Sequence, residues 1–159
     1  MLLSEIFKEK NIILNVKSTT KKDLFEELTD FLVKSENIQG RKEEILRGLI
    51  MREDMMTTGI ASNIALPHTH ISNLLKPAGV IAISRKGIEY ESIDNKPVHV
   101  IMLIIGDEAK PEEHLKILRN IALVMTNPDF IPTIMNSKSE KEIYESLEEF
   151  EEMSKFFYS

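Results

Sequence analysis

Hydrophobic residues in the first third of the chain recur at the three- and four-residue spacing of amphipathic helices. The pattern predicts a short helix over Ser4–Lys10 and a short strand over Ile12–Val16. Hydroxyl side chains at 18–20 are suited to cap a longer helix, and a second helix follows a polar break and ends near Arg52. The core-facing residues of these two helices are Leu24, Leu28, Phe31 and Leu32, then Ile45, Leu46, Leu49 and Ile50.

Apolar residues in the middle of the chain form continuous runs instead. The runs GVIAIS at 79–84 and Val98–Ile105 predict strands that are buried on both faces. Between them we expect a turn at Lys86–Gly87 and a short strand over Gly87–Tyr90. The segment Thr57–Pro67 is rich in small residues and favours extended backbone. The strands therefore cluster in the middle third.

The last third returns to helical spacing. A helix is expected to begin at Pro111, because proline suits a first helical turn. Another is expected over Asp129–Met135. The pattern Ser139-x-x-Glu142 is typical of a capping box and opens a final helix through Leu147.

Together these elements predict an α/β fold, with a mixed central β-sheet flanked by helices in a three-layer-like sandwich. A regular alternation of strands and helices is excluded, because the strands are not separated by helices. A length of 159 residues fits a single domain over 1–159. The tail at 149–159 is acidic and then aromatic, and we expect it to fray.

Composition narrows the function classes. The chain has 20 Lys and Arg against 26 Asp and Glu, a net charge of −6 that argues against a general nucleic-acid binder. It has no cysteine, which excludes disulfides, thiolate catalysis and cysteine-ligated metals. The longest apolar run, Val100–Ile105, is too short to span a membrane, and MLLSEIFKEK lacks the apolar core of a signal peptide. We expect a cytoplasmic protein without membrane insertion.

His68 is a candidate nucleophile, because it follows Pro67 at a strand end and an imidazole can accept a phosphoryl group. The alternative is an exposed loop histidine. His70, two residues on, is the other half of a potential metal site. Such a site needs further ligands, and no residue nearby has convincing spacing. His99, inside an apolar strand, fits a hydrogen-bonded core or edge residue.

Two further residues suit phosphate. His114 lies near the start of the helix that opens at Pro111, where backbone N–H groups attract anions. Arg52 precedes the hydroxyl-containing turn at 57–59, and a guanidinium can bind two phosphate oxygens. The alternatives are a partly exposed helix histidine and a surface ion pair between Arg52 and the carboxylates at 53–54. A nucleophile, an arginine and a helix start together suit phosphoryl transfer through histidine.

The stretch REDMMTTGIASNIALPHTH (Arg52–His70) resembles the signature of the IIA domain of the bacterial sugar phosphotransferase system, fructose/mannitol type. Two later stretches resemble the same family in order and spacing. They are KPAGVIAISRKGIEYESIDNKPVHVIMLI (Lys76–Ile104) and EEHLKILRNIALVM, which ends at Met125. The resemblance covers about residues 2–148, which we take as the core of the domain.

The resemblance implies a phosphotransferase component that needs no cofactor and no metal. His68 would accept a phosphoryl group from the phosphocarrier protein HPr and pass it to a cysteine of a IIB component, with the membrane component IIC as an indirect partner. His114 matches the second active-site histidine, Arg52 the active-site arginine, and Thr58 the family's STG-type turn. These three are the expected phosphate-binding residues.

The resemblance favours the fructose-like subgroup, from TTGI and the spacing between SIDNKPVH and EEHLKIL. Nitrogen-regulatory relatives, in which phosphorylation of the histidine controls partner binding, are the main alternative. A third possibility is a metal or small-ligand binder that uses His68 and His70 and is never phosphorylated.

Three positions depart from the family pattern: Ala61 and Asn63 stand in place of glycines, and His70 stands where a basic residue is common. We expect the first two to alter how closely the backbone approaches the phosphate, and His70 to change the local charge. Apolar side chains near the site predict either a docking ring for partners or plain core packing; they are Met55, Met56 and Leu74.

Overall fold

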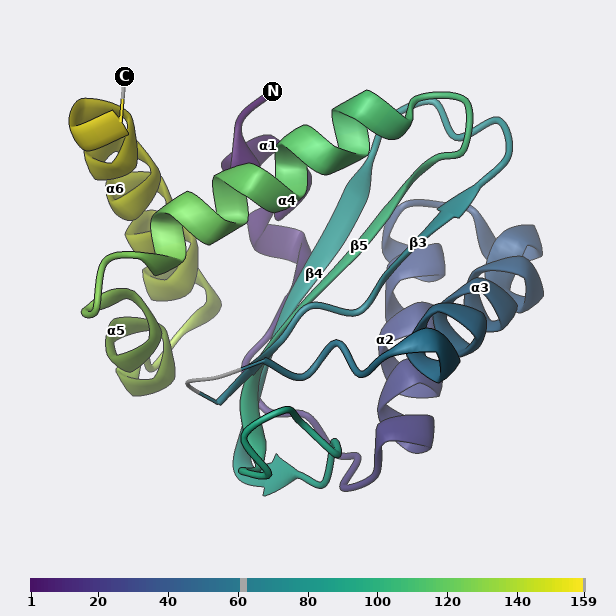
Figure 1. Cartoon of the computed structure of the whole chain (residues 1–159), viewed down its shortest axis with the longest axis horizontal. Helices are drawn as coiled ribbons and strands as arrows, with labels where there is room; N and C mark the ends of the chain where they lie inside the picture. Colours follow the sequence, from purple (N-terminus) through teal and green to yellow (C-terminus); the bar gives the residue numbers. More distant parts are fainter. Residues whose placement is uncertain (61–62, 159) are drawn as a thin grey trace.

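The computed structural model describes residues 1–60 and 63–158 and contains a five-stranded mixed β-sheet between two layers of helices (Figure 1). The two long central strands are antiparallel, and the short strands pair with them in parallel on either side. The strands are β1 (Ile12–Ile13), β2 (Ile64–Ala65), β3 (His68–Ile71), β4 (Ala78–Ile88) and β5 (Val98–Asp107). The order across the sheet is β1-β4-β5-β2, with β3 also on β5.

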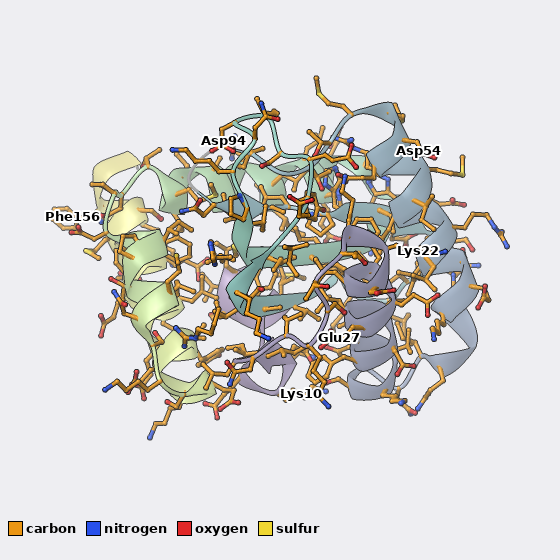
Figure 2. All side chains as sticks on the ribbon, turned by 90° about the horizontal axis from the view of Figure 1, so that it is seen from below. Lys10, Lys22, Glu27, Asp54, Asp94 and Phe156 are labelled. Atoms are coloured by element: carbon orange, nitrogen blue, oxygen red, sulfur yellow. The ribbon has the colours of Figure 1, made fainter. Side chains whose placement is uncertain are left out.

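Helices cover both faces of this sheet (Figure 1). On one face lie α2 (Lys21–Ser35) and α3 (Lys42–Met55), preceded by the 3-10 turns η1 (Glu9–Asn11) and η2 (Gln39–Arg41). On the other lie α1 (Leu3–Ile6), α4 (Pro111–Met125), α5 (Phe130–Asn136) and α6 (Glu140–Tyr158). Figure 2 shows the two outer layers on opposite sides of the molecule, with Asp54 on α3 and Phe156 on α6.

The central strands supply both cores. Along β4, Val80 and Ala82 pack into one apolar cluster, whereas Ile81 and Ile83 pack into the other. This alternation follows from the two-residue repeat of a strand. Burial on both faces is the reason that β4 and β5 read as continuous apolar runs. The three-layer α/β sandwich expected from the sequence is confirmed.

Several element boundaries differ from the prediction. The first strand is shorter than expected and contains only Ile12–Ile13, and α3 continues to Met55, beyond Arg52. The turn predicted at Lys86–Gly87 is instead an irregularity within β4, which continues to Ile88. Gly87 has a φ of 92°, a conformation that glycine adopts readily, so the strand bends there without ending.

The final helix is longer than predicted, because α6 continues beyond Leu147 to Tyr158. The reason is a contact between the two ends of the chain. The side chain of Glu151, only 7% exposed, accepts hydrogen bonds from the backbone N–H groups of Leu3 (2.6 Å) and Ser4 (3.4 Å). These N–H groups open α1 and have no partner within that helix. Within the part of the chain that the structure describes, no helix is long and apolar enough to cross a membrane.

Candidate functional site

Three histidines meet at one end of the sheet. His68 and His70 are two residues apart on β3 and therefore share a face of that strand. The parallel pairing of β3 with β5 places His70 opposite Gly106, shortly before the chain turns into α4, which carries His114. The ring centre of His114 lies 5.4 Å from that of His68 and 4.1 Å from that of His70. We call these three residues the histidine cluster.

One ring nitrogen of His68 is hydrogen-bonded to the backbone, and the other carries a lone pair that can act as a nucleophile. Its Nδ1 lies 2.8 Å from the carbonyl oxygen of Leu66. A carbonyl oxygen can only accept, so Nδ1 carries the hydrogen and Nε2 carries the lone pair. Burial lowers the pKa of His68, the positive charge of Arg52 lowers it further, and the bond to Leu66 offsets part of this. The ring is thus neutral near pH 7, as a nucleophile must be.

His114 is the buried member of the cluster, with 3% of its surface exposed. Neither ring nitrogen has a hydrogen-bond partner among the described residues. The ring packs against Gly106, where an added Cβ would lie 2.7 Å from Nδ1, so only glycine leaves room for it. Burial, followed by the nearby His70 and His68, lowers the pKa of His114 to about 4. A buried imidazole without partners indicates a site that a ligand completes, because such groups are rarely left unbonded.

Arg52 lies in the last turn of α3. Its Nη1 donates to the carbonyl oxygen of Met56 at 2.9 Å, which holds the guanidinium near the start of the following loop. Its charge is among the causes that lower the pKa of His68, so the two groups interact. Glu53, one of the carboxylates considered as its ion-pair partner, pairs instead with Lys21 at 3.1 Å.

A second polar group of residues surrounds Glu53, and we call it the Glu53 network. The Glu53 carboxylate accepts hydrogen bonds from the Thr58 backbone N–H (2.9 Å) and the Thr58 hydroxyl (2.6 Å). Because that hydroxyl donates to Glu53, the Tyr90 hydroxyl at 2.7 Å donates to it in turn. Lys21 pairs with Glu53 and lies 4.7 Å above the Tyr90 ring. Burial and then the charge of Glu53 raise the pKa of Tyr90.

The structure places Thr58 inside this network and not with the three histidines. Its side chain is buried, and its hydroxyl is bonded to both Glu53 and Tyr90. The neighbouring Gly59 packs so closely on Tyr90 that an added Cβ would lie 2.7 Å from the ring. This geometry gives Thr58 a supporting part in the loop that carries the site. A direct contact between Thr58 and phosphate stays a prediction.

Of the three departures from the family pattern, Asn63 has a backbone conformation that glycine adopts readily. Its φ is 67°, in the left-handed region that asparagine tolerates better than most residues. Its carbonyl oxygen accepts from the N–H groups of His99 (2.8 Å) and Val100 (3.1 Å), which ties the loop to β5. Ala61 lies outside the described residues. His70 is exposed and stands edge-on to His114.

The apolar side chains expected near the site divide into two groups. Met55 and Met56 are 82% and 64% exposed, as a docking surface would require. Leu74 is buried in the core cluster beside α2 and α3, so the core-packing alternative holds for it. The Nδ1 of His99 donates to the Ser84 carbonyl oxygen at 2.8 Å, as expected of a hydrogen-bonded strand histidine.

Within residues 1–60 and 63–158, no group of three or more His, Asp or Glu side chains is arranged to hold a metal ion.

The Glu53 network was missed by sequence reasoning. Its one local signal was the carboxylate next to Arg52, whereas Tyr90 is 32 residues from Thr58 and gave none.

Residues 5–150 match the family described as phosphoenolpyruvate-dependent sugar phosphotransferase system, EIIA 2. A fructose-specific EIIABC component from Bacillus subtilis is 29% identical over 146 residues, which are 90% of this chain and 22% of that protein. A nitrogen regulatory protein from Pseudomonas aeruginosa is 26% identical over 143 residues, 90% of this chain and 92% of that protein.

Solved structures share the fold. Nitrogen regulatory protein IIA-Ntr from Neisseria meningitidis has a TM-score of 0.79 at 23% identity and covers 91% of this chain and 98% of its own. The complex of mannitol IIA with phosphorylated mannitol IIB from Escherichia coli has a TM-score of 0.72 at 20% identity, with 88% and 95% covered. The chain thus spans nearly all of these domains and about a fifth of the B. subtilis relative.

Proposed function

This chain belongs to the EIIA 2 family of the phosphoenolpyruvate-dependent sugar phosphotransferase system, and we propose that it works as a phosphocarrier. His68 accepts a phosphoryl group from phospho-HPr and passes it to the cysteine of a IIB component. The observation that carries the proposal is the pairing of His68, whose Nε2 is free, with the buried and unpartnered His114. The IIA–IIB complex of the mannitol system supports a IIB partner for a domain of this fold.

In the accepting step, the Nε2 lone pair of His68 attacks phosphorus. A P–N bond forms while the bond between phosphorus and its leaving atom on HPr breaks, and that atom keeps the electron pair. The hydrogen stays on Nδ1 throughout, bonded to the Leu66 carbonyl oxygen, so no proton has to leave the ring. In the second step a IIB thiolate attacks phosphorus, the P–N bond breaks, and Nε2 recovers its lone pair. The ring is neutral and in the same tautomer before and after the cycle.

Arg52 and His114 stabilise the charge that is transferred. The phosphoryl group is anionic, and its transition state gains mostly from positioning and electrostatic stabilisation. Arg52 supplies a permanent positive charge close to His68. His114, which is neutral because its pKa is about 4, supplies one N–H donor from a dry position. The hydrogen bond that it lacks in the free protein forms when phosphate arrives.

The accepted group goes to a sugar system, and fructose or a related sugar is the substrate that we favour. The fructose-specific relatives from Bacillus subtilis and Haloferax volcanii, 29% and 28% identical, support this choice. The alternative is a nitrogen-regulatory role, which is supported by relatives of 26% and 28% identity. HPr and IIB are expected in the cytoplasm, where this phosphocarrier would meet them, with IIC reached only through IIB.

Intact-mass spectrometry tests the phosphocarrier role. The protein is incubated with phosphoenolpyruvate, Enzyme I and HPr at mildly alkaline pH, beside His68→Ala and His99→Ala. We expect one acid-labile phosphoryl group on the wild type and on His99→Ala, and none on His68→Ala. His99→Ala is the matched control, because His99 lies on β5 and bonds to Ser84. An unphosphorylated wild type with active HPr, or a phosphorylated His68→Ala, overturns the proposal.

Addition of a fructose IIB component then distinguishes transport from regulation. We expect the phosphoryl group to leave His68 and to be found on the IIB cysteine. A phosphorylated protein that keeps its group with every IIB component of the host points to the regulatory alternative instead.

A further inference from the structure

His70 is the one member of the histidine cluster that no role described so far uses. It follows His68 by two residues on β3, so both side chains leave the same face of the strand about 6.6 Å apart along it. Its ring is exposed, whereas His68 is half-buried and His114 is buried. The cluster thus extends from the interior to the solvent, with His70 at its outer end.

His70 and His114 contact each other through their imidazole rings. Their centres lie 4.1 Å apart and the planes are inclined by 64°, so the rings meet edge to face. They do not hydrogen-bond to each other, since both nitrogens of His114 are without a partner. No hydrogen bond from the His70 ring occurs within the described part of the chain either. Both imidazoles therefore keep an N–H that a ligand between them and His68 can accept.

Three donors consequently surround the position of the phosphoryl group. His114 approaches from the buried side, Arg52 from the end of α3, and His70 from the solvent side. A phosphoryl group on His68 has three terminal oxygens. Two donors leave one of these oxygens to water, and His70 is placed to bind it.

We propose that His70 is a third phosphate-binding residue, which donates a ring N–H to the phosphoryl group on His68 from the solvent side. This inference rests on the proposed phosphocarrier function and deepens it. It also gives a role to an exposed histidine whose ring stands against the buried imidazole of His114. A hydrogen bond to a charged group contributes more than a neutral one, so the contact matters for transfer and little for folding.

The test uses the full chain phosphorylated by phosphoenolpyruvate, Enzyme I and HPr. The variants are His70→Ala, which removes the donor, and His70→Gln, which keeps an N–H donor. The control is His99→Ala, a histidine outside the cluster. The readouts are the rate at which His68 accepts the phosphoryl group, the lifetime of the phosphorylated protein, and the phosphorus NMR shift of the phosphohistidine.

We expect His70→Ala to slow acceptance about tenfold or more, the loss of one hydrogen bond to a charged group, and to move the phosphorus signal. His70→Gln should recover most of the rate, and His99→Ala should match the wild type. Thermal midpoints should stay within a few degrees for all three variants.

Two outcomes overturn the inference while the phosphocarrier role stands. One is a His70→Ala variant that accepts phosphate at the wild-type rate with an unmoved phosphorus signal. The other is equal slowing in His70→Ala and His70→Gln with that signal unmoved, because His70 would then act only by packing on His114. A wild type that is never phosphorylated overturns the proposed function itself.

Discussion

Two polar groups of residues lie beside His68, and they are built in opposite ways. In the Glu53 network, the carboxylate is bonded by Thr58 and paired with Lys21, and the Tyr90 hydroxyl completes the chain of hydrogen bonds. In the histidine cluster, His114 is as well buried as Tyr90 but has no hydrogen-bond partner at either nitrogen.

The difference indicates that the Glu53 network supports the fold, whereas the histidine cluster is the candidate site of chemistry. A buried network whose groups are all bonded is rigid and stabilises the fold around it. A buried group that lacks its partner lowers stability, and the protein keeps it where a ligand supplies the missing bond. The Glu53 network therefore fixes the loop that follows Arg52, while the histidine cluster keeps unbonded groups that, under the proposed function, the phosphoryl group would bond. Variants of the two regions should accordingly change different measurements.

The largest effect is expected for His114→Ala. The rate at which His68 accepts a phosphoryl group should fall by about two to three orders of magnitude, as when a donor to a charged transition state is removed. The free energy of unfolding should also fall, because truncation of a buried ring leaves a cavity, so transfer is measured where denaturation shows the variant to be folded. Rapid-quench measurement with phospho-HPr, beside urea denaturation, checks both. Transfer at the wild-type rate would remove His114 from the mechanism.

The next effect concerns stability. Glu53→Gln should lower the free energy of unfolding by about 3 kcal/mol, because it leaves the partly buried charge of Lys21 without its partner and weakens the bonds to Thr58. Its transfer rate should fall less than that of His114→Ala. Urea denaturation measures the free energy of unfolding. Lys21→Gln, which leaves the Glu53 carboxylate without its ion-pair partner, is the matched variant. A loss below 1 kcal/mol in both would contradict the supporting role of the network.

Acid should weaken the protein through His114. Its pKa is about 4 in the folded protein against an ordinary value of 6.5, so between these values the unfolded chain binds more protons than the folded one. Stability is then fully present above pH 6.5 and falls as the pH drops toward 4. At about 1.4 kcal/mol per pKa unit, the His114 share is on the order of 3 kcal/mol. Denaturation of wild type and His114→Ala at several pH values isolates that share, and identical pH dependence would refute it.

The smallest effect is expected for Tyr90→Phe, which removes one buried donor and keeps the ring. The free energy of unfolding should fall by about 1 kcal/mol, the usual contribution of a hydrogen bond. Phosphoryl transfer should stay within twofold of the wild type, since the Tyr90 hydroxyl bonds to Thr58 and not to the histidine cluster. A large loss of transfer would show that the two regions are coupled.

Much of the fold followed from local pattern. Thr20 caps α2 through a bond from Asp23 N to its hydroxyl (3.2 Å), and the runs that predicted strands became β4 and β5. Such features depend on neighbours within a few residues or on burial of a whole strand, and the pattern of apolar and polar residues predicts both. The end of α6 was not foreseen, because Glu151 is bonded to Leu3, 148 residues away.

The candidate site divides in the same manner. The chain order around Pro67 and His68 pointed to a nucleophile, and the match of the 5–150 segment to its family confirms the type of domain. The packing and hydrogen bonds around His68 could not be predicted from the sequence. Whether Thr58 bonds to Tyr90 depends on how the loop after α3 packs on the end of β4, and no local pattern encodes that packing.

By itself the sequence determined the main helices and the two central strands and singled out the candidate site residues, because hydrophobic periodicity and residue type are local properties. Only the tertiary structure decided what those residues do together. The pairing of β3 with β5, and the return of the chain through α4, bring His114 within 5.4 Å of His68 and bury it without a partner. Burial, charge and missing hydrogen bonds are properties of a packed assembly, and no single segment of the chain contains them.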